Sequence, residues 1–115
     1  MERMQREVAH PNFWITLDSG KAMLNNSGNS GVYDLIERLG HRIGSTHLYD
    51  YPAEMKYARI LPGGRVVDVE GYVARLWKKG FRGPFSLETS GTRAEQKRAI
   101  LTLTEFVQKA MAATP

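Results

Sequence analysis

Residues 42–50 read RIGSTHLYD, and this stretch decides how the chain is expected to fold. Its composition and short length predict a β-strand over residues 42–48. Because side chains alternate between the two faces of a strand, Ser45 and His47 share one face. The strand therefore presents a polar face that ends on a histidine.

The same arrangement occurs once before and once after this strand. The earlier strand covers residues 13–17, FWITL, and ends at Asp18; the later one covers residues 83–87, GPFSL, and ends at Glu88. The hydroxyls two positions before the three terminal residues belong to Thr16, Ser45 and Ser86. The opposite face carries Ile15 and Leu17, Thr46 and Leu48, and Phe85 and Leu87. The matched alternation predicts that all three strands place polar side chains on one side of a common sheet.

Helical periodicity follows each predicted strand. The apolar residues at helical spacing are Val32, Leu35, Ile36 and Leu39, then Val69, Tyr72, Val73, Leu76 and Trp77, and finally Ile100, Leu103, Phe106, Val107, Ala110 and Met111. Gly40 and Gly80 stand where the first two helices are expected to end. Thr92 and Glu95 form a capping box that is expected to open the third helix.

Loops connect these elements, over residues 25–31 and 49–68, and residues 1–8 resemble the end of a further helix. Strands that alternate with helices predict βαβ units and a parallel sheet. Three such units fit a small open sheet or part of an eight-stranded barrel. A complete barrel needs about 250 residues, so this chain is expected to hold well under half of one.

Asp18, His47 and Glu88 are the candidate functional residues, because each ends a predicted strand. The C-terminal edge of a parallel sheet is where ligands bind and catalysis occurs. Two carboxylates and an imidazole suit Mn²⁺, Mg²⁺, Co²⁺ or Zn²⁺. Such an ion would polarise a substrate carbonyl or hydroxyl and stabilise an enediolate, while a carboxylate moves a proton. Taken singly, an aspartate such as Asp18 is more often a turn or helix-cap residue, a histidine such as His47 is more often structural, and a glutamate such as Glu88 is commonly a solvated loop residue. The matched register of the three favours a shared site.

Composition restricts the class of protein. The chain of 115 residues is 42% apolar and 24% charged, as expected for one small domain or a piece of a larger one. The net charge is +4, but the basic residues are scattered, which favours solvated helix faces over a nucleic-acid surface. The absence of cysteine excludes disulfides and thiolate chemistry. No apolar stretch approaches the length of about 20 residues that spans a bilayer, and the cytoplasm is the expected location.

These segments resemble the xylose isomerase-like TIM-barrel superfamily of sugar isomerases and epimerases, which also includes metal-dependent apurinic endonucleases. The resemblance runs from about residue 11 to residue 90 and rests on the order and spacing of several blocks. The blocks are ITLDSG at 15–20, LGHRI at 39–43, THLYD at 46–50, LPGG at 61–64 and GFRGPFSLE at 80–88. The resemblance implies an α/β fold in which residues 1–115 form one incomplete domain, the last three βα units (strands six to eight) of a (β/α)8 barrel.

By the same resemblance, Asp18, His47 and Glu88 would be metal ligands. Glu88 would also be one of two glutamates that move a proton between neighbouring sugar carbons. Its partner belongs to strand five, which is expected to lie outside this chain. Arg59 matches a position that helps to hold the substrate in many relatives, and Asp50 is expected to orient the loop after the second strand.

The chain departs from the family pattern at two positions. Many relatives carry histidine three residues after the aspartate of strand six, where this chain has Lys21. The positively charged ammonium group of Lys21 would still bind a substrate oxygen, so Lys21 is a candidate substrate contact. The turn at residues 62–65 reads PGGR and lacks the acidic residue that is common in the family.

Three functions stay open from the sequence. The first is part of a divalent-metal-dependent sugar or sugar-phosphate isomerase or epimerase, with a small-molecule partner. The second is an endonuclease-like metal nuclease, although residues 55–64 contain no histidine and nothing resembles the Asp-x-His pair that the endonucleases use. The third is a non-catalytic barrel fragment or assembly subunit. Open sheet edges predict that such a chain associates with another copy or with a separate N-terminal part of the barrel.

Overall fold

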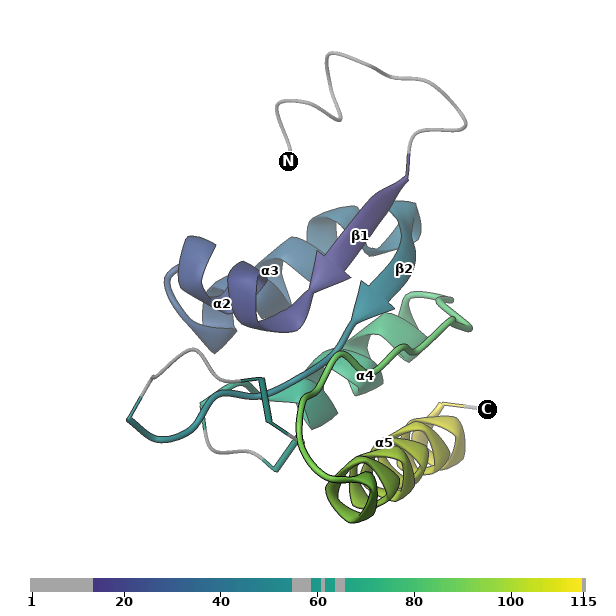
Figure 1. The fold of residues 1–115 in the computed structure, drawn as a ribbon. Coiled ribbons are helices and arrows are strands. Elements are labelled where there is room, and N and C mark those ends of the chain that lie inside the picture. Colours follow the sequence, from purple (N-terminus) through teal and green to yellow (C-terminus); the bar gives the residue numbers. More distant parts are fainter. Residues whose placement is uncertain (1–13, 55–58, 61, 64–65, 115) are drawn as a thin grey trace.

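The computed structural model describes residues 14–54, 59–60, 62–63 and 66–114 (Figure 1). The elements in chain order are β1 (Ile15–Asp18), α2 (Ser19–Asn25), α3 (Asn29–Leu39), the 3-10 turn η1 (Gly40–Arg42), β2 (Ile43–His47), α4 (Val69–Lys78) and α5 (Arg93–Ala113). The helix end expected at residues 1–8 and the first residue of the expected strand, Phe13, lie outside the described residues.

Strands β1 and β2 form a parallel pair, as the sequence predicts. Thr16 is paired with Ser45, and Asp18 is paired with His47. The two paired hydroxyls are hydrogen-bonded at 2.7 Å, which fixes the register on the polar face. The predicted alternation is therefore confirmed for these two strands, and their two terminal residues lie side by side.

The strand predicted over residues 83–87 is not regular, and this prediction needs correction. One parallel bridge joins Leu87 to Leu48, through hydrogen bonds from Leu48 N–H to Ser86 C=O and from Glu88 N–H to Leu48 C=O. Upstream of that bridge, the buried Thr46 hydroxyl donates to the Pro84 carbonyl at 2.8 Å. The Thr46 side chain thus takes the place of a backbone donor next to Pro84. Proline has no N–H, so it cannot donate a hydrogen bond to a neighbouring strand.

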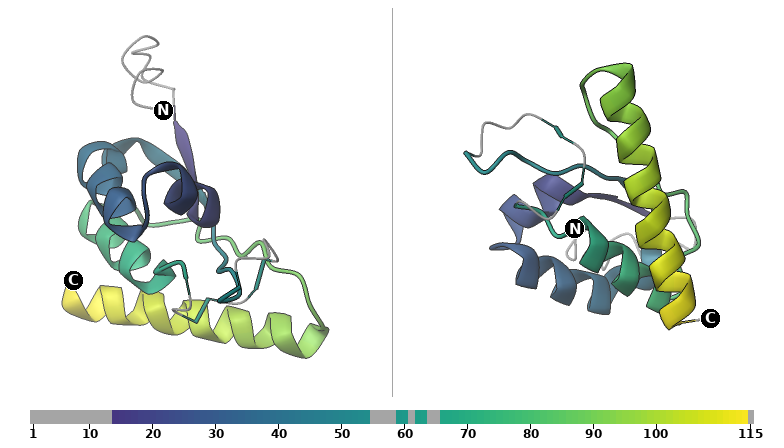
Figure 2. Two further views of the ribbon diagram at one scale, coloured as in Figure 1. Left: turned by 90° about the vertical axis from the view of Figure 1, so that its left-hand side faces the viewer. Right: turned by 90° about the horizontal axis from the view of Figure 1, so that it is seen from below.

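Helices α3, α4 and α5 lie in chain order along one side of the sheet (Figures 1 and 2). The other side of β1 and β2, which carries Thr16 and His47, is exposed among the described residues. Helices on one face and polar side chains on the other are what a segment of a barrel wall shows, because helices surround a barrel and the second face points inward.

A short helix, α2, was not expected from the sequence, and α3 begins at Asn29, inside the stretch predicted to be a loop. Asp18 caps α2, because its Oδ1 accepts a hydrogen bond from Lys21 N–H at 3.0 Å. Ala22 and Met23 are buried by the turn that this cap starts. Helix α2 is too short for periodicity to reveal it.

The predicted helix ends fit the structure. Gly80 follows α4 with a φ of 98°, and its N–H donates to Trp77 C=O while Phe81 N–H donates to Leu76 C=O. This is the Schellman arrangement that favours glycine. Thr92 and Glu95 form the predicted capping box at the start of α5. Gly40 is the C-cap of α3 but keeps right-handed helical angles and continues into η1.

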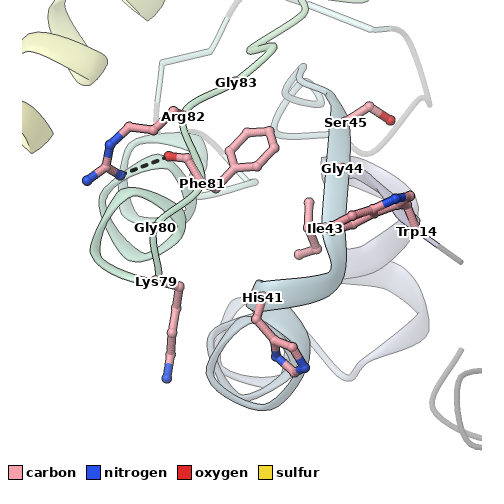
Figure 3. Close-up of a pocket in the computed structure, with 11 residues that line it drawn as sticks. Trp14, His41, Ile43, Gly44, Ser45, Lys79, Gly80, Phe81, Arg82 and Gly83 are labelled. Atoms are coloured by element: carbon pink, nitrogen blue, oxygen red, sulfur yellow. Dashed lines mark hydrogen bonds between the residues drawn. The ribbon is translucent and has the colours of Figure 1, made fainter. Parts of the chain in front are cut away.

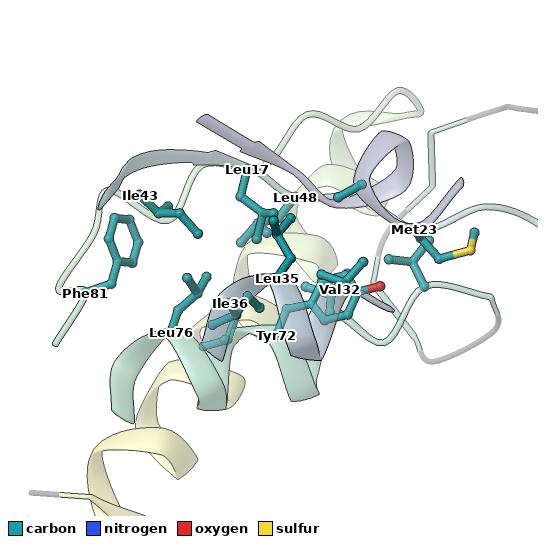
Figure 4. Close-up of a cluster of buried hydrophobic side chains, with 14 of the residues drawn as sticks. Leu17, Met23, Val32, Leu35, Ile36, Ile43, Leu48, Tyr72, Leu76 and Phe81 are labelled. Carbon is teal, nitrogen blue, oxygen red and sulfur yellow. The ribbon is translucent and has the colours of Figure 1, made fainter. Parts of the chain in front are cut away.

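The core lies between the sheet and the helices (Figure 4). Leu17 and Leu48 point from the sheet segments toward the helices, and both are fully buried. The residues that meet them from the helices are Val32, Leu35 and Ile36 of α3 and Tyr72 and Leu76 of α4. The apolar face predicted for β1 and β2 is therefore the core face.

Helix α5 uses only part of its predicted apolar stripe. Leu103 and Ala110 are buried, as expected, whereas Ile100 is 58% and Met111 is 47% exposed. Both exposed residues line an apolar groove of about 550 Å³ that also contains Phe85, Leu87 and Val107. Nothing in the described part of the chain covers this groove, which is why these two residues stay exposed.

Candidate metal centre

Asp18, His47 and Glu88 converge at the C-terminal ends of the two strands and of the bridged segment. One ligand atom from each residue lies within 4.8 Å of the others. Parallel pairing explains the convergence, because it places Asp18 beside His47 and brings Glu88 in through the bridge at Leu87. In the residues that the structure describes, this is the one group of three or more such side chains close enough to share an ion.

Each of the two carboxylate oxygens of Glu88 lies close to a nitrogen of a neighbouring side chain. Its Oε2 lies 3.1 Å from His47 Nδ1, and its Oε1 lies 2.9 Å from Arg59 Nη1. The Oε2 atom is buried, yet it accepts no hydrogen bond from the described residues; His47 approaches at ion-pair distance without hydrogen-bonding geometry. A buried acceptor without a donor is unfavourable, and a bound cation would satisfy it.

Asp18 is held by two donors on a single oxygen. The Tyr49 hydroxyl and the Lys21 backbone N–H both donate to Oδ1. Burial is the main cause that raises the pKa of the Tyr49 phenol far above its ordinary range, and the hydrogen bond to Asp18 is the second. The phenol therefore stays protonated and acts as a donor. Among the described residues, both hydrogen bonds to the Asp18 carboxylate are on Oδ1.

Arg59 reaches the site from the loop between β2 and α4. Its guanidinium lies 4.9 Å from the centre of the Tyr49 ring as well as against Glu88. Its backbone carbonyl accepts hydrogen bonds from Ser90 N–H and from the Ser90 hydroxyl. Burial lowers the pKa of the Arg59 guanidinium, but attraction to Glu88 and other acidic groups of the site outweighs burial, so the pKa is raised.

Asp50 anchors the same loop, as the sequence predicts. It is fully buried, and its Oδ1 accepts hydrogen bonds from three backbone N–H groups, those of Tyr51, Val66 and Val67. Its backbone also pairs with that of Ile60 in an antiparallel bridge, next to Arg59. The anchored loop fixes where Arg59 meets the site.

Tyr49 is the site residue that the sequence analysis missed. Alternation along the chain puts residue 49 on the same face as His47, so a signal for it was present. Its ring packs edge-on against Tyr51, with 5.5 Å between ring centres. A side chain at Gly20 would overlap both rings, so glycine at this position permits the aromatic pair to lie against α2.

Lys21 and Arg59, the two predicted substrate contacts, are placed differently. The contact that ties Lys21 to the site is its backbone N–H, and its side chain is exposed. Arg59 is part of the site itself through its ion pair with Glu88. A role in binding substrate remains a prediction for both residues.

The donor set fits a divalent cation. One carboxylate oxygen each from Asp18 and Glu88 and one nitrogen of His47 combine two carboxylates with an imidazole, the ligands that Mn²⁺, Co²⁺ and Zn²⁺ accept. The buried Glu88 oxygen that lacks a donor is the structural observation that favours an ion. These three residues, without a fourth protein ligand in the described chain, leave coordination positions for substrate oxygens or water.

The pocket in Figure 3 lies at the other end of β2. It has a volume of about 590 Å³ and contains Trp14, His41, Gly44 and Phe81. Trp14 precedes β1, His41 just precedes β2 and Gly44 lies at its start, whereas Asp18 and His47 are the last residues of the two strands. Active sites of parallel barrels lie at the C-terminal edge of the strands, so we assign the candidate site to the residues at that edge.

The chain belongs to the family described as xylose isomerase-like TIM barrel, whose model matches residues 1–110. This family covers isomerases, epimerases and endonucleases of the apurinic type. No curated protein and no solved structure matched the chain significantly. Among the described residues, every helix is too short or too polar to cross a membrane.

Proposed function

We propose that the chain forms part of a divalent-metal-dependent isomerase or epimerase that acts on a sugar or sugar phosphate. The observation that carries the proposal is the convergence of Asp18, His47 and Glu88 at the ends of parallel strands, with one Glu88 oxygen buried and lacking a donor. Family membership supports it. In this proposal β1, β2 and residues 85–88 correspond to barrel strands six, seven and eight.

The side chains divide the work according to their contacts. A bound divalent cation would polarise a substrate carbonyl or hydroxyl and stabilise negative charge on the adjacent carbons. Asp18 and His47 would hold the ion, and Glu88 would contribute Oε2 while Arg59 orients its other oxygen. Glu88 would also take up and return the proton on the carbon next to the carbonyl. Arg59, at the same open face, would bind a substrate oxygen.

The test is exchange of carbon-bound hydrogen with solvent. The purified chain with Mn²⁺ is incubated in D₂O with a panel of ketoses and ketose phosphates, and deuterium incorporation is followed by NMR. We expect incorporation beside the carbonyl of at least one sugar, lost in Glu88→Gln and kept in Asp34→Asn, which changes an exposed carboxylate paired with Arg38. Equal incorporation by Glu88→Gln, or none with any sugar, contradicts the proposal.

The nuclease alternative makes a different prediction. Binding to phosphates releases counterions, so a nuclease would retard duplex DNA at low salt and release it as salt rises. We expect no retardation, since the basic residues are scattered along the sequence. The described residues also hold one group of candidate metal ligands, with no second group for the extra metals of an endonuclease. Salt-sensitive retardation together with Mn²⁺-dependent cleavage would replace the isomerase proposal by the nuclease.

We further propose that the chain associates, with another copy or with a separate part of the barrel, as open sheet edges favour. The exposed polar face of β1 and β2 and the apolar groove beside α5 support this proposal. In a closed barrel, neighbouring strands and helices would cover both surfaces.

A further inference from the structure

We propose that Tyr49 is a positioning residue of the cation site, which fixes Asp18 directly and Glu88 through Arg59. This inference rests on the proposed function, because it assigns Tyr49 a role toward the ion that Asp18, His47 and Glu88 would hold. The residue contacts two sides of the site at once, one with its hydroxyl and the other with its ring face.

The hydroxyl sets the orientation of Asp18. It donates to Asp18 Oδ1, the same oxygen that accepts the Lys21 backbone N–H. Because both donors share Oδ1, the hydroxyl and the helix cap together restrain the orientation of the carboxylate. Metal-binding carboxylates are commonly oriented by such an outer hydrogen bond.

The ring face sets the position of Arg59. The guanidinium lies 4.9 Å from the ring centre, within the range of a cation–π contact. The same guanidinium holds Glu88 Oε1 at 2.9 Å. Because Oε1 is engaged in this way, Oε2 is the oxygen that faces His47.

Tyr49 is itself held rigidly. It is 1% exposed, and the buried Ser19 hydroxyl donates to its carbonyl at 2.8 Å and accepts from its N–H at 2.9 Å. Ser19 directly follows Asp18 in the chain, so this pair of hydrogen bonds ties the ends of β1 and β2 together. The phenol therefore reaches Asp18 from a fixed backbone.

The test compares two matched tyrosine variants. Tyr49→Phe removes the hydroxyl and keeps the ring, and we expect a ten- to hundredfold weaker Mn²⁺ affinity by calorimetry, the usual effect of removing an outer partner of a metal ligand. The control is Tyr33→Phe: Tyr33 also donates to an aspartate, Asp68, and also lies under an arginine, with Arg75 3.6 Å from its ring centre. That cluster holds no candidate ligand, so we expect wild-type affinity.

Two further measurements separate positioning from a general loss of structure. The visible absorption of bound Co²⁺ reports its coordination, and we expect Tyr49→Phe to change the spectrum and Tyr33→Phe to leave it unchanged. In an Asp18→Asn background, Tyr49→Phe should weaken Mn²⁺ binding no further, because the hydroxyl acts through the carboxylate.

The outcomes are distinct. If the wild-type chain binds neither Mn²⁺ nor Co²⁺, the proposed function fails and the inference fails with it. If the wild type binds and Tyr49→Phe matches it in affinity and spectrum, the inference fails while the proposed function stands. An equal loss in Tyr49→Phe and Tyr33→Phe would also overturn the inference, since both would then act through stability alone.

Discussion

Replacing Asp50 by asparagine is expected to destabilise the loop that carries Arg59. Asp50 is fully buried, and its Oδ1 accepts hydrogen bonds from Tyr51 N–H at 2.7 Å, Val66 N–H at 3.1 Å and Val67 N–H at 2.7 Å. A hydrogen bond to a charged acceptor is stronger than one to a neutral acceptor by about 1 kcal/mol. Three such bonds give an expected decrease of about 3 kcal/mol in the free energy of unfolding.

The assay is urea unfolding followed by circular dichroism, with wild type, Asp50→Asn and Asp34→Asn compared at one pH. Asp34 is a matched control, because its side chain is 69% exposed and pairs with Arg38 on the helix surface. Surface pairs of this kind contribute little, so Asp34→Asn should unfold with the wild type. A decrease below about 1 kcal/mol for Asp50→Asn would refute the reasoning, because the charge would then contribute little to the three bonds.

Three further outcomes follow from the fold. Thr92→Ala should lower the free energy of unfolding by about 1 kcal/mol in urea, because it removes the capping box at the start of α5; an unchanged midpoint would contradict this. Burial raises the pKa of Tyr72, so its contribution to stability is complete below about pH 10 and is lost as the pH rises above that value; thermal melts should show this loss in wild type and a smaller one in Tyr72→Phe, and parallel curves would argue against it. Ile100→Glu places a charge in the apolar groove and should shift the mass measured by light scattering toward the monomer, whereas an unchanged mass would show that association does not use this groove.

The shared polar face of the strands, and the meeting of Asp18 and His47 at its end, could be predicted because both depend on local alternation. Thr16 and Ser45 are paired as the spacing predicts, and their neighbours Asp18 and His47 meet at the strand ends. The period of two in a strand fixes which side chains share a face, whatever the rest of the chain does. The capping box and the glycine after α4 were predictable for the same reason, since each depends on a few adjacent residues.

The features that the sequence analysis missed depend on long-range contacts. Irregular pairing at residues 83–87 results from the Thr46 hydroxyl, which is far away in sequence and bonds to Pro84. Exposure of Ile100 depends on what covers α5, and periodicity alone carries no information about that. The contact of Tyr49 with both Asp18 and Arg59 likewise requires the loop to fold back over β2.

The central claim is that Asp18, His47 and Glu88 bind one divalent cation, and calorimetric titration of Mn²⁺ into the purified chain tests it most directly. We expect a single binding event in the micromolar range that is lost in His47→Ala, weaker but still measurable in Asp18→Asn, and unchanged in Asp34→Asn. No heat of binding, or binding that is unchanged in both His47→Ala and Asp18→Asn, would contradict the claim.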